Sequence, residues 1–132
     1  MNFLQWCRAA VGKRIDFDHA YGAQCVDLVN VYAQAFRAAG AFKGNAVDIA
    51  RQNATGWRWV ANAPTNYPTA GDVVVWAKDA RIGTGDAGHT ALCLAADTRV
   101  LLVLEQNWPT GSPVAVGWHS YDGVLGWQTP AE

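Results

Sequence analysis

The sequence predicts an α+β fold in which N-terminal helices pack on an antiparallel β-sheet of four to six strands. Apolar residues recur at helical spacing in the first third of the chain, whereas short β-branched runs separated by turn residues fill the remainder. Helices that precede a meander of strands are typical of the α+β class. The chain has 132 residues, of which 51% are hydrophobic, and this suits a single domain over residues 1–132 with one substantial core.

Three helices are expected before the strands, over residues 2–12, 25–39 and 46–52. Gly12 and Gly40 end the first two, because glycine favours the position that follows a helix. Asn45 can cap the N-terminus of the third, since its side-chain oxygen can accept a hydrogen bond from a free backbone N–H group.

The expected strands cover residues 73–76, 89–96, 99–105, 114–121 and 124–127. Asp97-Thr98 supplies the turn between the second and third of them. In a tight antiparallel hairpin, the start of one strand lies beside the end of the next. His89 is therefore expected to lie close to the segment from Glu105 to Asn107.

Composition and charge argue against several classes of function. The formal net charge of -1 gives no reason to expect nucleic acid or an anionic membrane as a partner. No apolar run reaches the roughly 18 residues that a membrane span needs. The first residues lack the basic and apolar regions of a secretion signal, so release from the cell is expected to need another agent. The seven Trp either fill the core or line a groove for sugars or peptides.

The three cysteines, Cys7, Cys25 and Cys93, do not form the pattern of a disulfide framework, and no Cys-x-x-Cys motif indicates structural zinc. Cys7 falls on the apolar stripe of the first helix, and Cys93 falls inside a strand. Both are expected to be structural thiols.

Cys25 is the candidate nucleophile. It opens the longest predicted helix, where free backbone N–H groups and a partial positive charge favour a thiolate and can stabilise an oxyanion. Burial in the core is the alternative, because Cys25 also lies on the apolar stripe of that helix. His89 is the candidate base, and Glu105 or Asn107 could orient it, which would complete the groups that cysteine attack on an amide requires.

Four segments resemble, in the same order, the motifs of CHAP domains. They are YGAQCVDL at 21–28, GDVVVW at 71–76, GHTA at 88–91 and EQNW at 105–108. CHAP domains are papain-like cysteine amidohydrolases and peptidases of bacterial cell walls and are common in phage endolysins. The resemblance extends from about residue 12 to residue 130, and it implies a papain-like fold and peptidoglycan as the substrate.

The resemblance also implies a role for each candidate site residue. Cys25 would be the nucleophile, and His89 would act first as general base and then as general acid. Glu105 would orient and polarise His89. Asn107 matches a further polar position that would share this role, and Gln24 matches a position that would help to bind the oxyanion.

An acidic loop precedes the candidate nucleophile and has the spacing of a calcium site. Oxygen donors fall at positions 1, 3, 5, 7 and 12 of a twelve-residue loop, from the side chains of Asp16, Asp18 and Asp27 and the carbonyls of Ala20 and Gly22. Some CHAP domains bind Ca²⁺ through this loop, so the resemblance implies Ca²⁺ and no organic cofactor.

Another interpretation of the acidic loop stays open. His19 stands where such loops often carry glycine. Without a metal, Asp16 and Asp18 would cap the start of the helix and interact with Lys13 or Arg14.

Two other functions also stay open. An amidase toxin against rival bacteria would use the same groups, and a non-catalytic wall-binding or virion module would keep the fold alone. As an endolysin-type enzyme, the chain is expected to be a monomeric catalytic domain that stays in the host cytoplasm until a holin allows its release. It would act as an endopeptidase or as an N-acetylmuramoyl-L-alanine amidase.

Overall fold

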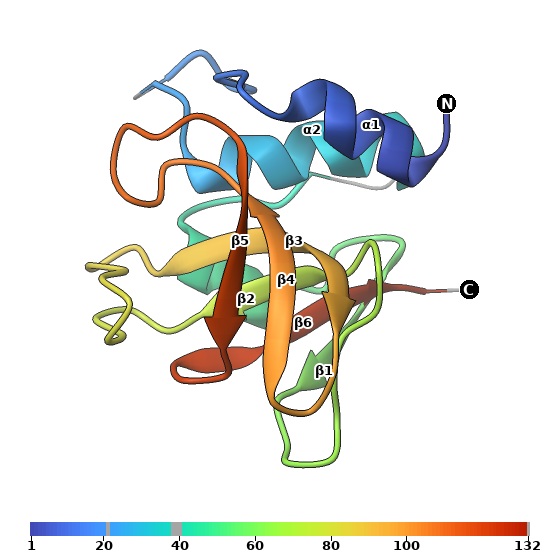
Figure 1. Cartoon of the computed structure of the whole chain (residues 1–132), viewed down its shortest axis with the longest axis vertical. Helices are drawn as coiled ribbons and strands as arrows, with labels where there is room; N and C mark the ends of the chain where they lie inside the picture. The colour runs from blue at the N-terminus through green and yellow to red at the C-terminus, as the bar shows by residue number, and fades with distance from the viewer. Residues whose placement is uncertain (21, 38–40, 132) are drawn as a thin grey trace.

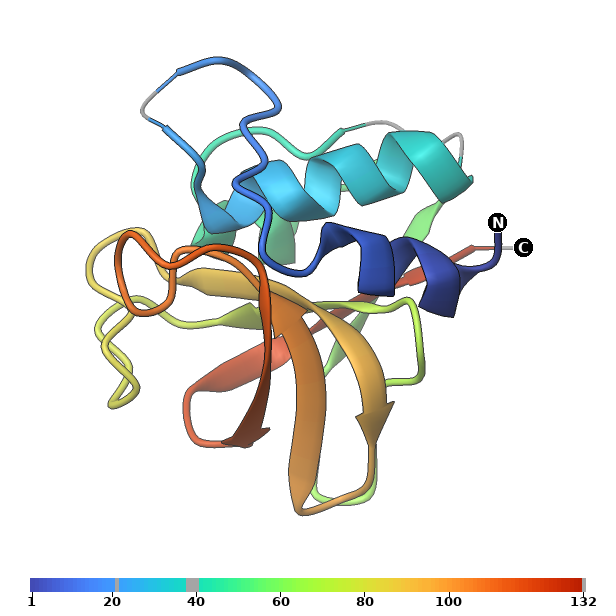
Figure 2. The same ribbon diagram turned by 45° about the horizontal axis from the view of Figure 1, so that its top comes forward.

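Two helices lie side by side across one face of a curved antiparallel sheet (Figures 1 and 2). The computed structural model describes residues 1–20, 22–37 and 41–131. Its elements are α1 (Phe3–Ala10), α2 (Cys25–Arg37), the 3-10 helix η1 (Ala46–Arg51), β1 (Trp57–Ala61), β2 (Val73–Trp76), β3 (His89–Ala96), β4 (Val100–Glu105), β5 (Ala115–Ser120) and β6 (Val124–Pro130). This order confirms the predicted α+β class.

The six strands form one sheet in the order β1-β6-β2-β3-β4-β5, and every neighbouring pair is antiparallel. Strands β2 to β6 lie where strands were predicted, with small shifts at their ends. The first strand, β1, was not predicted. It pairs with β6 along its whole length, from Trp57 opposite Pro130 to Ala61 opposite Gly126.

Local sequence signals explain the helix boundaries. Asn2 and Gln5 form a reciprocal pair of hydrogen bonds at 2.8 and 2.9 Å that caps α1. Gly12 follows that helix at a φ of +85°, and its N–H donates to the Val114 carbonyl at 2.8 Å. Asn45 takes the predicted cap position of η1, which is a 3-10 helix. The predicted end of the second helix at Gly40 lies outside the described residues.

None of the helices in the described ranges combines the length and the apolar character that crossing a membrane requires.

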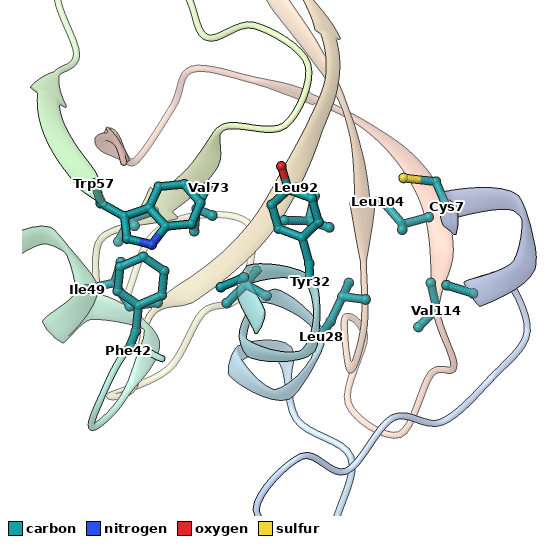
Figure 3. Packing of buried hydrophobic residues seen from close by; sticks show 14 residues of the cluster. Cys7, Leu28, Tyr32, Phe42, Ile49, Trp57, Val73, Leu92, Leu104 and Val114 are labelled. Atoms are coloured by element: carbon teal, nitrogen blue, oxygen red, sulfur yellow. The ribbon is translucent and has the colours of Figure 1, made fainter. Parts of the chain in front are cut away.

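The main core lies between the helices and the sheet (Figure 3). Leu28, Val29 and Tyr32 of α2 are fully buried and belong to the same cluster as Leu92 and Leu104 of the sheet. The α2 stripe therefore fixes the helix on the middle strands, which places its first residue, Cys25, at one end of β3.

A second cluster covers the opposite face of the sheet. It contains Val74, Trp76, Ala91, Cys93, Leu101, Val103, Val124 and Trp127. Side chains alternate between the two faces of a strand, so His89 shares the face of Ala91, and Glu105 shares the face of Val103. Two predicted site residues thus project from the same face.

Candidate active site

Cys25 is the first residue of α2 and is half-buried. Its thiol is free. The start of a helix carries unpaired backbone N–H groups and a partial positive charge, which favour negative charge on a thiolate or on an oxyanion. The first turn of α2 therefore suits both a nucleophile and the anion that its attack would create.

His89 opens β3, and the glycine before it is required by its surroundings. Gly88 has a φ of +74°, and a Cβ atom there would lie 2.7 Å from the Trp76 carbonyl oxygen and 2.9 Å from Cβ of Val47. Only glycine fits this close approach without displacing the backbone. Gly88 thereby allows the chain to enter β3 with the His89 side chain buried.

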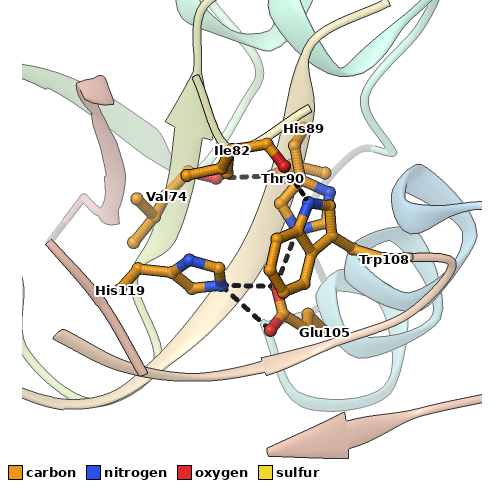
Figure 4. Close-up of polar contacts among 7 residues, drawn as sticks. All are labelled: Val74, Ile82, His89, Thr90, Glu105, Trp108 and His119. Atoms are coloured by element: carbon orange, nitrogen blue, oxygen red, sulfur yellow. Dashed lines mark hydrogen bonds and ion pairs between the residues drawn. The ribbon is translucent and has the colours of Figure 1, made fainter. Parts of the chain in front are cut away.

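The predicted adjacency within the β3–β4 hairpin is present. Leu92 lies opposite Leu104, so the beginning of β3 runs beside the end of β4. Nε2 of His89 lies 2.8 Å from Oε1 of Glu105, and both side chains are buried (Figure 4). An imidazole held by a carboxylate is the arrangement that a general base needs.

The charges of this pair stabilise each other. Burial lowers the pKa of His89, but hydrogen bonding and charge interactions with Cys25 and Glu105 outweigh it and raise that pKa to about 9. Burial raises the pKa of Glu105, yet hydrogen bonds from His119 and His89 bring it below its ordinary value. The site therefore favours an imidazolium beside a carboxylate.

A second histidine, His119, contacts the same carboxylate and was not predicted. Its Nε2 lies 2.9 Å from Oε1 and 3.0 Å from Oε2 of Glu105 (Figure 4). The His119 ring packs against Trp76 and Trp108, with centroids 5.1 and 4.8 Å apart. In the sequence His119 is simply one histidine in a predicted strand, and nothing in its spacing connects it to Glu105.

Asn107 and Gln24 both line the groove beside Cys25 and His89. Asn107 adopts a φ of +64°, and its carboxamide oxygen accepts a hydrogen bond from the Gly111 N–H at 2.7 Å. Asn107 therefore shapes the loop at the edge of the groove. Gln24 is exposed immediately before Cys25.

Gln106 is a further residue whose role was not predicted. It is fully buried. Its Oε1 accepts from the Ile15 N–H at 2.7 Å, and its Nε2 donates to the carbonyls of Ile15 and Gln24 at 2.8 and 2.7 Å. Gln106 thus ties the end of the Glu105 strand to the chain that leads into Cys25.

The groove around these residues has a volume of about 160 Å³. Its walls are the first turn of α2, the start of η1, the turn that precedes His89 and the loop from Asn107 to Thr110. Trp108 forms part of this wall and donates from Nε1 to the Ile82 carbonyl at 2.8 Å. Cys25 and His89 are both among the lining residues, so a substrate in the groove would reach both.

Three carboxylates of the acidic loop converge beside the active-site helix. One oxygen each from Asp16, Asp18 and Asp27 lies within 4.8 Å of the other two. Among the described residues, Oδ1 of Asp16 is buried and has no hydrogen-bond partner. Burial, with the nearby charges of Asp18 and Asp16, raises the pKa of Asp27, although backbone hydrogen bonds from Gln24 and Phe17 oppose this. An orphaned buried carboxylate oxygen and three converging oxygens fit a hard cation such as Ca²⁺.

Among the described residues of this loop, His19 (+57°) and Gly22 (+74°) have positive φ angles. His19 therefore occupies a backbone conformation that favours glycine, which agrees with the glycine that such loops often carry at this position. The Ala20 N–H donates to Oδ1 of Asp18 at 2.9 Å, which orients that carboxylate.

Cys7 and Cys93 are buried free thiols, in α1 and β3 respectively. Burial raises the pKa of Cys7 to about 11, and burial together with the charge of Asp72 raises that of Cys93 to about 12. Both thiols therefore stay protonated and unreactive at neutral pH.

Comparison with known proteins agrees with this geometry. The sequence model of the CHAP domain matches residues 14–107. Endolysin PlyTW of Staphylococcus phage Twort is 32% identical in an alignment 135 residues long that covers 90% of this chain and 27% of that protein.

Solved structures of other proteins share the fold. The crystal structure of wild-type endolysin LysIME-EF1 superposes with a TM-score of 0.82 at 30% identity, and the match covers 97% of this chain and 62% of that one. The structure of Ly7917 shares the fold with a TM-score of 0.71 at 20% identity, over 97% of this chain and 60% of that one. The chain thus spans less than two thirds of each of these relatives. It belongs to the CHAP domain family.

Proposed function

We propose that this chain is a peptidoglycan hydrolase that cleaves amide bonds of the bacterial cell wall with a cysteine nucleophile. The observation that carries the proposal is the shared groove. Cys25 lines it from a helix N-terminus, and His89 lines it while bound to a buried Glu105. The CHAP family and the similarity to an endolysin supply the substrate class.

In the proposed reaction the proton of Cys25 resides on His89, so the nucleophile is a thiolate beside the imidazolium that the raised pKa of His89 favours. A carboxylate can only accept hydrogen bonds, so Nε2 of His89 carries a hydrogen toward Glu105. Nδ1 is then the ring nitrogen left to accept the thiol proton. The resulting thiolate attacks the carbonyl carbon of the amide, and the carbonyl oxygen becomes an oxyanion.

The other groups act on the charges that form. The backbone N–H groups at the start of α2 face the developing oxyanion, and the Gln24 side chain adds a donor at the same end of the groove. His89 then donates its proton to the leaving amine, and an acyl-enzyme remains on Cys25. Water activated by His89 hydrolyses the acyl-enzyme and restores the thiol. Glu105 stabilises the imidazolium, and Asn107 holds the groove loop.

The experiment that tests this function uses purified cell walls and identifies the fragments. Wild-type protein and Cys25→Ala are incubated with peptidoglycan of several cross-bridge types, and the soluble products are sequenced by mass spectrometry. A stem peptide with a free alanine N-terminus would identify an amidase, and a cut within the stem or cross-bridge an endopeptidase. Equal release by both proteins from every wall would overturn the proposal.

We also propose that the acidic loop binds Ca²⁺. Asp16, Asp18 and Asp27 would supply carboxylate ligands, and Ala20 and Gly22 are candidates for carbonyl ligands. The buried Asp16 oxygen without a described hydrogen-bond partner supports a role for Asp16 as a metal ligand. A bound Ca²⁺ would neutralise the mutual repulsion of the three carboxylates. Because Asp27 lies in the first turn of α2, the loop and the nucleophile helix would be ordered together.

A further inference from the structure

We infer that His119 is a positioning residue of this active site, which holds the Glu105 carboxylate in the orientation that His89 requires. The inference rests on the proposed function, because it assigns His119 a part in the same cysteine chemistry. His119 does not line the groove, so it acts through Glu105 and does not touch the substrate.

The contact geometry distinguishes the two histidines. His89 contacts one oxygen of Glu105, whereas Nε2 of His119 reaches both, at 2.9 and 3.0 Å. A hydrogen bond to a single oxygen leaves the carboxylate free to rotate about its last bond. A donor shared between both oxygens fixes the plane of the group. His119 therefore sets where Oε1 lies, and Oε1 is the atom that accepts from His89.

The sheet is built to allow this contact. Glu105 lies opposite Ala115 in the β4–β5 register, and His119 lies opposite Leu101, four residues along the strand. The Glu105 side chain reaches His119 only by leaning over Gly117, which lies between them. A Cβ atom at Gly117 would overlap Oε2 of Glu105 and would lie 3.7 Å from Nε2 of His119. The absence of a side chain at Gly117 thus opens the path of the carboxylate.

Two tryptophans hold both imidazoles in place. Trp76 packs against the rings of His89 and His119 at the same centroid distance of 5.1 Å. Trp108 lies 4.8 Å from the His119 ring and 6.4 Å from the His89 ring. A ring at position 119 therefore has a packing role of its own, and a test must remove the N–H donor while it keeps the ring.

The charge balance of the buried carboxylate agrees with this role. Burial alone raises the pKa of Glu105, and the hydrogen bond from His119 is the largest influence that lowers it. The titratable groups that face Glu105 are His89 from β3 and His119 from β5, with Cys25 beyond His89. His119 thus helps to keep the carboxylate charged when His89 gives up its proton to the leaving group.

The test compares two variants at position 119 and then repeats one of them in a variant that lacks Glu105, the residue through which His119 acts. His119→Phe keeps a ring between the tryptophans and removes the donor, whereas His119→Gln restores an N–H that can reach the carboxylate. Each protein is assayed for wall lysis and for the rate at which iodoacetamide alkylates Cys25, located by mass spectrometry. We expect His119→Phe to lower both rates about 10- to 100-fold, by analogy with the loss of an outer hydrogen bond to a metal-ligating side chain. His119→Gln should recover most of the loss.

A double-mutant cycle separates positioning from a general structural role. In a Glu105→Ala background, His119→Phe should lower the rates by no more than about 2-fold further, because the carboxylate that His119 would position has already been removed. The same loss in both backgrounds would overturn the inference, as would wild-type rates for His119→Phe. Should His119→Phe fail to fold, by its melting curve, Gly117→Ala takes its place in the same cycle, since its methyl group displaces the carboxylate.

The alkylation assay keeps this inference separate from the proposed function. A protein that never cleaves peptidoglycan, yet loses Cys25 reactivity on His119→Phe, would contradict the proposed function alone. A protein that cleaves walls equally well with and without the His119 donor would contradict the inference alone.

Discussion

Nε2 of Gln106 donates a hydrogen bond to the carbonyl of Gln24 at 2.7 Å, which joins the end of β4 to the residue before the candidate nucleophile. The two residues are 82 positions apart in the chain. Glu105 and Cys25 are the direct neighbours of this pair, so the contact sets the position of the thiol relative to the carboxylate that holds His89. The position of Cys25 relative to Glu105 thus depends on the buried side-chain amide of Gln106.

Gln106→Leu should therefore lower both stability and activity. It leaves three backbone groups of Ile15 and Gln24 without their partner at partly buried contacts, where the cost is smaller than the about 1–3 kcal/mol of each fully buried polar group left unpaired. We expect a loss of about 2–3 kcal/mol in urea denaturation, with a lower lysis rate per folded molecule. Gln52→Leu is the matched control, because Gln52 hydrogen bonds to Lys43 at an exposed site and does not line the groove. An equal loss of activity in both variants would contradict this role.

Cys25→Ala should abolish wall lysis with little change in the melting curve. It removes the only half-buried thiol, whereas Cys7 and Cys93 are buried and protonated. Cys7→Ala and Cys93→Ala should keep the activity per folded molecule, although Cys93→Ala should cost about 1 kcal/mol through a small cavity. Turbidity clearing by Cys25→Ala at a tenth of the wild-type rate would rule out the cysteine mechanism.

His89→Ala should reduce lysis more than Glu105→Gln does. Without the imidazole, neither the thiol nor the leaving amine has a proton partner. A glutamine at 105 can still orient both rings but carries no charge to stabilise the imidazolium. Initial rates of turbidity loss, compared with circular dichroism of each variant, give the ranking. The reverse ranking would show that Glu105 does more than orient and polarise His89.

Stability and activity should both decline as the pH rises through about 9. His89 has a pKa raised from 6.5 to about 9 in the folded chain, so the folded state binds its proton more tightly than the unfolded state does. The resulting stability is fully present below about pH 6.5 and is lost as the pH rises through 9. Melting temperatures measured between pH 6 and 10 test this prediction. The midpoint of the decline should lie within about one pH unit of 9. In His89→Ala the alkaline decline should be smaller, and an unchanged decline would assign it to other groups.

The strands that the sequence predicted are those whose apolar runs stand between clear turns. Val73–Trp76 matches its prediction residue for residue, because its four apolar side chains are buried on both faces. β1 was missed because its five residues contain no β-branched run, Val60 being the one β-branched side chain among them. Its strand conformation comes from pairing with β6, about 70 residues away, and a local pattern does not contain that information.

The same distinction applies to the site. The His89–Glu105 contact was predictable because both residues belong to one hairpin, whose register a short turn fixes. The contact between His119 and Glu105 was not, because the direct neighbour of Glu105 on β5 is Ala115. It depends on the absence of a side chain at Gly117. A glycine in the sequence indicates this contact only when the pairing of β4 with β5 is already known.

Removal of calcium should lower both the melting temperature and the lysis rate. Asp16, Asp18 and Asp27 converge within 4.8 Å, so without a cation their charges repel one another beside the nucleophile helix. A metal that binds only the folded chain adds stability by mass action, about 2.7 kcal/mol at a free concentration 100 times its Kd. EGTA should therefore reduce both quantities, and Ca²⁺ should restore them. Mg²⁺ should restore them poorly, since it demands a tighter octahedral site.

Asp18→Asn and Asp48→Asn complete the calcium test as a matched pair. Asp18→Asn removes one charge from the cluster and should resemble the EGTA-treated wild type, with little further response to Ca²⁺. Asp48 lies in the first turn of η1, outside the cluster, so Asp48→Asn should respond to Ca²⁺ as the wild type does. Isothermal titration of each metal-free protein measures binding directly and does not depend on lysis. Unchanged melting and lysis in excess EGTA, with no heat of Ca²⁺ binding, would instead leave the carboxylates as helix caps and partners of Lys13 and Arg14.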